Sequence, residues 1–238
     1  MHILVLEGGH IEAEFREKFG PAHTYHFWEN SLPFFTEEDI EKIEAGEYEY
    51  LTPEPVAPPD AIFVFKTDGY WSWDASSEPS NCVVFQESSS TKSLPGRLGD
   101  LPTFGFCGLP TLLNRPLLEV SLWHESNHEK LTETCAALGT DYRVVADRVG
   151  LVTPRVICQI INEACFTVQE GTATMQDVDL GMKLGTSYPH GPFAWANAIG
   201  VERVYAVLEA MWHDTHDERY KVCPLLKRQA LRGEPFIV

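Results

Sequence analysis

Basic residues are scarce in this sequence, which has 18 Lys and Arg against 35 Asp and Glu and a net charge of −17. No run of Lys or Arg forms a basic stripe, so nucleic acid and anionic membrane surfaces would be repelled. We therefore expect neither as a partner. The same acidity is equally compatible with a high-salt habitat or a margin of solubility.

Long apolar runs and paired cysteines are also missing. No apolar run approaches the length of a membrane span, and the opening residues carry neither a basic region nor a small-residue cleavage site. We therefore expect no signal peptide and a reduced, cytoplasmic protein. Cysteines without a CxxC pair or zinc spacing indicate buried small hydrophobes and no metal site. There are six of them: Cys82, Cys107, Cys135, Cys158, Cys165 and Cys223.

The 238 residues, 44% of them hydrophobic, are enough for one large or two modest globular domains. Short apolar runs separated by helices or loops predict a parallel, doubly wound sheet. The expected strands are His2–Leu6, 24–29, 61–65, 82–85, 103–107, Leu117–Leu122 and 142–146. The expected helices among them are 11–19, 37–44 and 125–138.

After Asp147 the pattern becomes entirely helical. Apolar residues cover much of the circumference of 151–169, which predicts a long buried helix. Thr153 can cap this helix, Pro154 suits its first turn, and Gly171 can end it. Further helices are expected at 174–184, 201–213 and 224–231. The chain thus divides into an α/β domain, 1–146, and a helical domain, 147–238.

A fixed corner separates two of these helices. It holds two Gly, two Pro and two aromatic residues, and we expect Gly185 to stop the preceding helix. His190 is interpreted as a turn residue, and Asp177 and Asp179 as charges in the first turn of a helix. Phe193 and Trp195 are expected to bury aromatic area against the long helix. The corner reads Met182-Lys-Leu-Gly-Thr-Ser-Tyr-Pro-His-Gly-Pro-Phe193.

This corner, together with Asp147-Arg-Val-Gly-Leu-Val-Thr-Pro-Arg155, Ile161-Asn-Glu-Ala164, Glu170-Gly171 and Asp177-Val-Asp179, resembles the C-terminal domain of 3-hydroxyacyl-CoA dehydrogenases. The resemblance implies a Rossmann-like α/β N-terminal domain that binds NAD. It also implies an all-α domain of the 6-phosphogluconate dehydrogenase C-terminal type. That domain covers an acyl-CoA cleft and forms a homodimer.

The same resemblance places a dinucleotide-binding turn at Val5-Leu-Glu-Gly-Gly-His-Ile-Glu12. Gly8 and Gly9 would lie against the pyrophosphate of NAD, and Glu29 would bind the ribose. Glu7 and Glu12 stand where the family's pattern has its other glycines, and both bring negative charge. A simple tight turn between strand and helix is the alternative interpretation.

Family catalysis uses a His–Glu pair, and the matching run is Gly105-Phe-Cys-Gly-Leu-Pro-Thr-Leu-Leu-Asn-Arg-Pro-Leu-Leu-Glu-Val120. Glu119 falls on the family's Glu, Cys107 falls on its His, and Pro154 falls on its Asn. A thiol is a weaker base than imidazole, since its ordinary pKa is about 8.5. His124 is a further candidate for a catalytic role. The alternatives are that Cys107 is a buried inert residue and that His124 caps a strand end.

Ser90 and Ser93 resemble the family's polar segment that contacts substrate. Three functions remain open. One is an NAD-dependent 3-hydroxyacyl-CoA dehydrogenase with displaced catalytic residues, whose nucleotide pocket is neutralised by His10 or Lys92. Another is a non-catalytic relative that binds a nucleotide, an acyl-CoA or a partner subunit. The third is a protein that binds a different small ligand in the same cleft.

Overall fold

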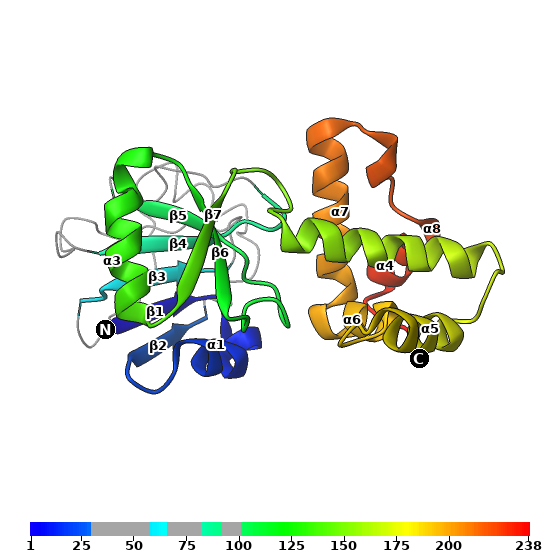
Figure 1. Cartoon of the computed structure of the whole chain (residues 1–238), viewed down its shortest axis with the longest axis horizontal. Helices are drawn as coiled ribbons and strands as arrows, with labels where there is room; N and C mark the ends of the chain where they lie inside the picture. Colours follow the sequence, from blue (N-terminus) through cyan, green and yellow to red (C-terminus); the bar gives the residue numbers. More distant parts are fainter. Residues whose placement is uncertain (30–57, 66–81, 92–100) are drawn as a thin grey trace, which may run out of the picture.

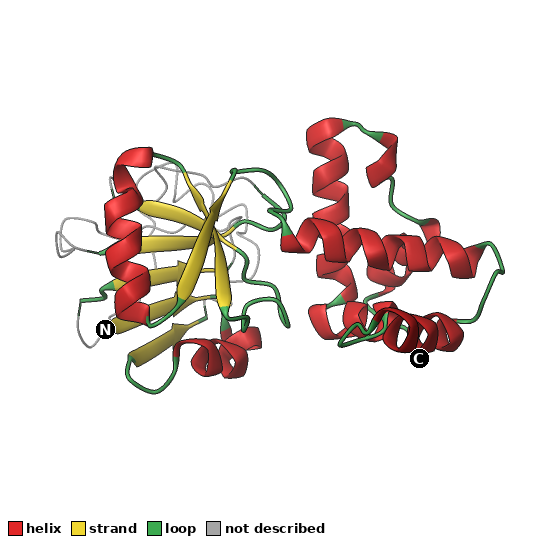
Figure 2. Ribbon diagram, in the orientation of Figure 1, coloured by secondary structure: helices red, strands yellow, loops and turns green. Residues whose placement is uncertain are grey.

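The computed structural model describes residues 1–29, 58–65, 82–91 and 101–238, in which a sheet half and a helical half lie side by side (Figures 1 and 2). The predicted strands are confirmed with shifts of one or two residues at their ends. They are β1 (His2–Leu6), β2 (Thr24–Trp28), β3 (Ala61–Val64), β4 (Val83–Glu87), β5 (Thr103–Phe106), β6 (Leu117–Leu122) and β7 (Asp141–Val145). The predicted helix 37–44 lies outside the described residues.

The described strands form one sheet of seven, in the order β2-β1-β3-β4-β5-β6-β7. Strands β1 to β5 are parallel, as predicted. Strand β6, however, runs antiparallel to β5, so the expectation of a wholly parallel sheet is wrong. Only residues 107–116 connect these two strands, and a parallel crossover needs a dozen residues or more.

One face of the sheet carries an aromatic core. The helices α1 (Glu12–Phe19) and α3 (His128–Leu138) bury Phe15 and Leu131 against it. The rings of Phe63 and Phe85, on neighbouring strands, stack with centroids 4.7 Å apart. Short 3-10 helices precede these two helices at η1 (Gly9–Ile11) and η3 (Glu125–Asn127). This packing fixes the carboxyl ends of β1 to β5 at one edge of the sheet.

The helical half is organised around α4, which packs against α6, α7 and α8. Its helices are α4 (Thr153–Gln169), α5 (Met175–Thr186), α6 (Pro192–Ile199), α7 (Val201–Thr215), η4 (Glu218–Tyr220) and α8 (Pro224–Arg232). The prediction missed α6, which begins inside the corner. It also overstated the burial of α4, because Val156 is 52% exposed while Ile157 and Ile161 are buried. No helix among the described residues is long and apolar enough to cross a membrane.

The corner is held by a carboxylate. Asp179 accepts hydrogen bonds from the backbone N–H groups of Phe193 (2.7 Å) and Ala194 (2.9 Å), so it caps α6 from the preceding helix. The first turn of α5 holds Asp177, as predicted, whereas Asp179 lies in the second turn, so the expectation for Asp179 is wrong. Its side chain is buried. A Cβ on Gly191 would lie 2.2 Å from Cγ of Asp179, which excludes any larger residue there without rearrangement.

The other corner residues behave in part as expected. Phe193 and Trp195 are buried in the helical core, as predicted. His190 is exposed, with its ring 5.7 Å from that of Trp195, consistent with a turn residue. Helix α5 continues through Gly185 and ends at Thr186, so the expected stop at Gly185 is wrong.

The packing at the corner predicts opposite effects of one methyl group at two glycines. Gly191→Ala should lower the free energy of unfolding by about 1–3 kcal/mol, because the added Cβ overpacks against Asp179. Gly181→Ala, inside α5, should raise it by about 0.5–1 kcal/mol, because its added methyl group would meet nothing within 4 Å. Urea denaturation of both variants measures the difference. Equal effects of the two substitutions would contradict this role of Asp179.

Candidate functional site

The turn after β1 is closed by a carboxylate that follows β2. The backbone N–H of Gly9 donates a hydrogen bond of 2.5 Å to Oε1 of Glu29. A Cβ on Gly8 would lie 2.4 Å from Cγ1 of Val5, so the turn has no room for a larger residue at this position. Glu7 adopts a φ of 57°, a strained conformation for a residue other than glycine. The turn therefore brings Gly8, Gly9 and Glu29 together, as predicted, but with Glu29 bonded to the turn itself.

This arrangement does not fit a pyrophosphate. The N–H that an incoming phosphate would use already binds a carboxylate, and a second carboxylate follows β1 directly at Glu7. Phosphate oxygens would meet negative charge at short range. Glu12 pairs with Arg16 within α1, where the two side chains make a contact of 2.8 Å. Entry of NAD into this turn would require Glu29 to move away.

Cys107 is buried between the two halves. It is 3% exposed and lies in the helical core with Leu109 and Leu112. Burial, and then the charge of Glu87, raise the pKa of its thiol far above the ordinary value. The thiol therefore stays protonated at neutral pH and is unsuited to act as a base.

Glu119 is engaged as a helix cap. Its carboxylate accepts hydrogen bonds from the backbone N–H groups of Val152 and Thr153, the latter at 3.0 Å from Oε2. It therefore caps α4 across the connection between the halves, so the expectation that the Thr153 side chain is the cap is wrong. Pro154 occupies the first turn of α4, as predicted. Both carboxylate oxygens of Glu119 are thus used in holding a helix.

His124 lies at the opposite edge of the sheet from Cys107. Strand β6 is antiparallel to β5, so Val120 pairs with Phe106 near the carboxyl end of β5, whereas the end of β6 that leads to His124 lies toward the start of β5. The His124 ring is exposed and contacts Trp123. The expectation that His124 could join Cys107 and Glu119 is therefore wrong, and the reason is the unpredicted direction of β6.

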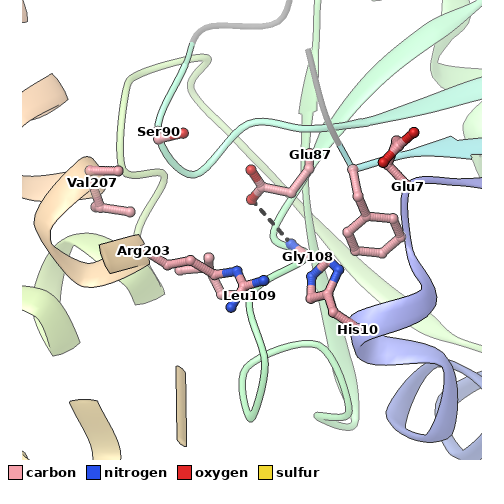
Figure 3. A pocket seen from close by; sticks show the side chains of 10 residues that line it. Glu7, His10, Glu87, Ser90, Gly108, Leu109, Arg203 and Val207 are labelled. Atoms are coloured by element: carbon pink, nitrogen blue, oxygen red, sulfur yellow. Dashed lines mark hydrogen bonds between the residues drawn. The ribbon is translucent and has the colours of Figure 1, made fainter. Parts of the chain in front are cut away.

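A pocket of about 300 Å³ lies between the carboxyl ends of β1, β3 and β4 and the first turns of α7 (Figure 3). In open α/β sheets ligands bind at this edge, where the strand order changes direction. The predicted Ser90 lies in its wall, whereas Ser93 and Lys92 lie outside the described residues. The pocket is lined by Glu7, His10, Phe65, Glu87, Ser90, Gly108, Leu109, Arg203, Ala206 and Val207.

Glu87 ends β4 and forms the polar floor of this pocket. Its Oε1 accepts hydrogen bonds from the backbone N–H groups of Ser89 (2.9 Å) and Gly108 (3.4 Å). Burial raises the pKa of the carboxyl, although these hydrogen bonds and the charge of Arg203 oppose the rise. The sequence prediction missed Glu87; an acidic residue at the end of a buried strand was the available signal.

His10 and Arg203 complete the polar lining. Burial, and then the charge of Arg203, lower the pKa of His10, which packs edge-on against Phe65 with ring centroids 5.7 Å apart. Arg203 belongs to the first turn of α7, and nothing in the sequence of that helix singled it out. Its Nη1 lies 3.4 Å from both the carbonyl oxygen of Ile199 and Oε1 of Glu202.

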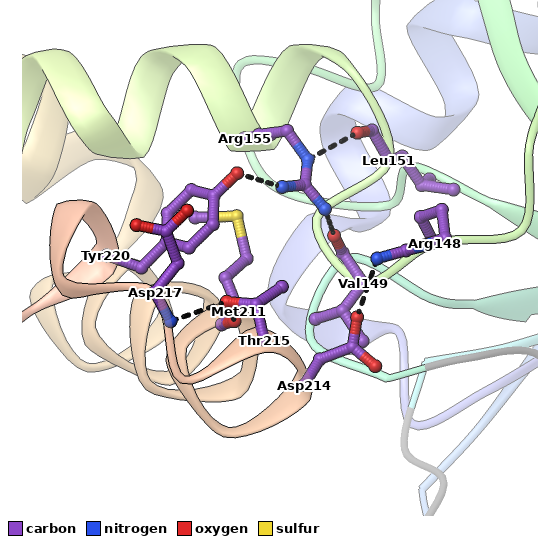
Figure 4. Close-up of polar contacts among 9 residues, drawn as sticks. All are labelled: Arg148, Val149, Leu151, Arg155, Met211, Asp214, Thr215, Asp217 and Tyr220. Atoms are coloured by element: carbon purple, nitrogen blue, oxygen red, sulfur yellow. Dashed lines mark hydrogen bonds and ion pairs between the residues drawn. The ribbon is translucent and has the colours of Figure 1, made fainter.

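The α7 wall is fixed relative to the sheet by contacts across the connection. Arg155 donates hydrogen bonds to Tyr220 Oη at 2.5 Å, to the carbonyl oxygen of Leu151 at 3.3 Å and to that of Val149 (Figure 4). Arg148 pairs with Asp214 of α7 at 3.3 Å.

A further contact joins the sheet half directly to the helical core, since Trp195 Nε1 donates to Thr111 Oγ1 at 2.9 Å. The pocket therefore has walls from both halves that are held in one arrangement.

Comparison with known proteins identifies the helical half. Residues 150–235 match the family model for the 3-hydroxyacyl-CoA dehydrogenase C-terminal domain. A 3-hydroxyadipyl-CoA dehydrogenase of Escherichia coli K12 is 42% identical over 87 residues, which are 37% of this chain and 18% of that protein. A probable 3-hydroxybutyryl-CoA dehydrogenase of Deinococcus radiodurans is 32% identical over 120 residues, 49% of this chain and 43% of that protein. Each match thus spans less than half of the relative.

Solved structures extend the likeness in fold to both halves. FadB2 of M. tuberculosis aligns with a TM-score of 0.70 at 17% identity, covering 97% of this chain and 93% of that one. The (S)-3-hydroxybutyryl-CoA dehydrogenase PaaH1 of Ralstonia eutropha gives 0.65 at 17% identity, covering 98% and 94%. The resemblance inferred from the sequence is confirmed, as is the fold class. Residues 150–235 thus resemble the C-terminal domain of 3-hydroxyacyl-CoA dehydrogenases, and the chain as a whole has the fold of a Rossmann-like sheet followed by a helical domain.

The role of Glu119 as a cap predicts a loss of stability. Glu119→Gln should lower the free energy of unfolding by about 1 kcal/mol, because a neutral amide interacts less well with the N-terminus of α4. Thermal unfolding measures this loss. The exposed Glu17→Gln is a control with the same change in charge, and an equal effect of both variants would contradict the cap.

The half-buried Glu87 predicts a pH-dependent stability. A carboxyl with a pKa above its ordinary 4.5 in the folded state binds its proton more tightly when folded. The wild type should therefore lose stability, relative to Glu87→Gln, as the pH rises from 4.5 through the raised pKa. Melting temperatures of both proteins across this range measure the difference. A difference that stays constant with pH would show that the carboxyl is not perturbed.

Proposed function

We propose that this protein binds an organic ligand in the pocket between its two halves and does not carry out the NAD-linked oxidation of a 3-hydroxyacyl-CoA. The proposal rests on the three positions that match the family's catalytic residues, because each of them has a structural role in this protein. Cys107 is a buried protonated thiol, Glu119 caps α4, and Pro154 lies in the first turn of that helix. None of the three is placed to take a proton from a substrate hydroxyl group.

The proposal extends to the cofactor. The family implies NAD, but Glu29 holds the turn that would bind its pyrophosphate. We propose that this carboxylate excludes NADH at micromolar concentrations. The Gly8–Gly9 turn then serves as a tight connection from β1 to α1, which is the alternative left open by the sequence.

Assembly is the third part of the proposal. Helix α5 exposes Leu180 (57%) and Leu184 (76%), and the start of α4 exposes Val152 and Val156 (52% each). Apolar side chains of this size on neighbouring helices favour a homodimer formed through the helical half. All six cysteines are free and buried, which favours a reducing cytoplasmic setting and acyl-chain metabolism as the context.

A titration with NADH, read by energy transfer from tryptophan, tests the proposal. The wild type should show no saturable binding up to millimolar NADH and no turnover of acetoacetyl-CoA. Glu29→Ala should bind NADH more tightly than the wild type, because it removes the side-chain acceptor that competes for the Gly9 N–H. The exposed Glu17→Gln on α1 controls for the change in net charge. Micromolar binding with turnover in the wild type would overturn the proposal and restore the enzyme interpretation.

A further inference from the structure

The pocket combines a permanent cation with two titratable groups that face it. Of the described residues in its lining, Arg203 alone carries a permanent positive charge. It reaches into the pocket from α7, toward His10 and Gly108 on the sheet half (Figure 3). The guanidinium has five N–H donors, and its contacts with Ile199 and Glu202 both involve Nη1 at 3.4 Å. The donors on the other two nitrogens can therefore serve a ligand.

The exposed carboxylate of Glu202 pairs with this cation through Nη1 at 3.4 Å, whereas burial disfavours charge on the two titratable groups across the pocket. Burial raises the pKa of Glu87 and lowers that of His10, so both are driven toward their neutral forms. Glu7 lies on the opposite side of the pocket, beyond Glu87 and His10 (Figure 3), and Glu29 is bonded to Gly9. In a chain of net charge −17, Arg203 therefore offers the donors of Nε and Nη2 to a ligand in this part of the pocket, while Nη1 contacts Glu202.

The shape and chemistry limit what fits. A volume of about 300 Å³ is at the lower end for ligand pockets, which excludes a whole dinucleotide or CoA thioester from its interior. Phe65, Leu109 and Val207 offer apolar contact to a short carbon chain. A single guanidinium matches a carboxylate through two parallel hydrogen bonds, whereas a dianionic phosphate would need more positive charge.

We propose that the pocket binds a small organic carboxylate, whose carboxylate group pairs with Arg203 and whose second polar group is hydrogen-bonded by Glu87. This inference rests on the proposed function and names the class of its ligand. Arg203 and Glu87 face each other from different halves, so the ligand bridges them. The backbone donors of Ser89 and Gly108 both bind Oε1 of Glu87, and neither uses Oε2.

Calorimetric titration with acetoacetate, 3-hydroxybutyrate and glutarate, and with the methyl ester of each, tests this inference. At least one free acid should bind the wild type, and its ester should bind at least about tenfold more weakly, the equivalent of about 1.4 kcal/mol. Arg203→Met should cause a similar loss. Arg203→Lys should recover part of the affinity, because it keeps the charge but not the paired donors.

Arg232→Met, an exposed arginine in the last turn of α8, is the matched control and should bind like the wild type. Melting temperatures establish that each variant is folded. If an ester binds as tightly as its acid and Arg203→Met changes nothing, the carboxylate inference fails while ligand binding in the pocket stands. If none of the six probes binds, the inference is overturned. Micromolar NADH binding with turnover would instead overturn the proposed function itself.

Discussion

The structure depends on a carboxylate that crosses from the sheet to the helical half. Glu119, on β6, receives the backbone N–H groups at the start of α4, and so joins the two halves where the chain passes between them. The first N–H groups of a helix have no partner within the helix, and an anion there also meets the positive end of its dipole. Because α7 packs on α4, this cap acts with the Arg148–Asp214 pair and the Trp195–Thr111 hydrogen bond to set where Arg203 stands relative to Glu87.

A carboxylate also accepts hydrogen bonds from backbone N–H groups at three other places, so part of the negative charge of the protein has a structural role. Asp179 caps α6, Glu87 binds the Gly108 N–H, and Glu29 binds the Gly9 N–H. In the first two cases a carboxylate satisfies backbone donors that would otherwise lose water without compensation. The third case has a chemical consequence, since the same donor cannot hold both Glu29 and a phosphate. This supports the proposal that the turn serves as a tight connection between β1 and α1.

The sequence was sufficient for the elements whose signal is local. Apolar runs located every described strand, and the corner from Met182 to Phe193 identified the family of the helical domain. The direction of β6 was missed, since it depends on the length of the 107–116 connection and not on the pattern of the strand. The pocket was missed for a related reason. Glu87 and Arg203 are far apart in the chain and meet only because the halves dock, so no spacing could have paired them.

The sequence placed His124 wrongly and did not single out Arg203, and both errors have the same physical origin. A site formed between two halves takes its residues from whichever segments the docking brings together, and family spacing predicts only those whose backbone path is retained. Here family spacing singled out Cys107 and Glu119, but their side chains serve packing and capping. Burial has different effects on the charged groups that line the cleft. It disfavours the charged forms of Glu87 and His10, whereas the guanidinium of Arg203 keeps its positive charge. An acidic protein can therefore present a guanidinium to a ligand in a pocket where burial disfavours the negative charge of Glu87.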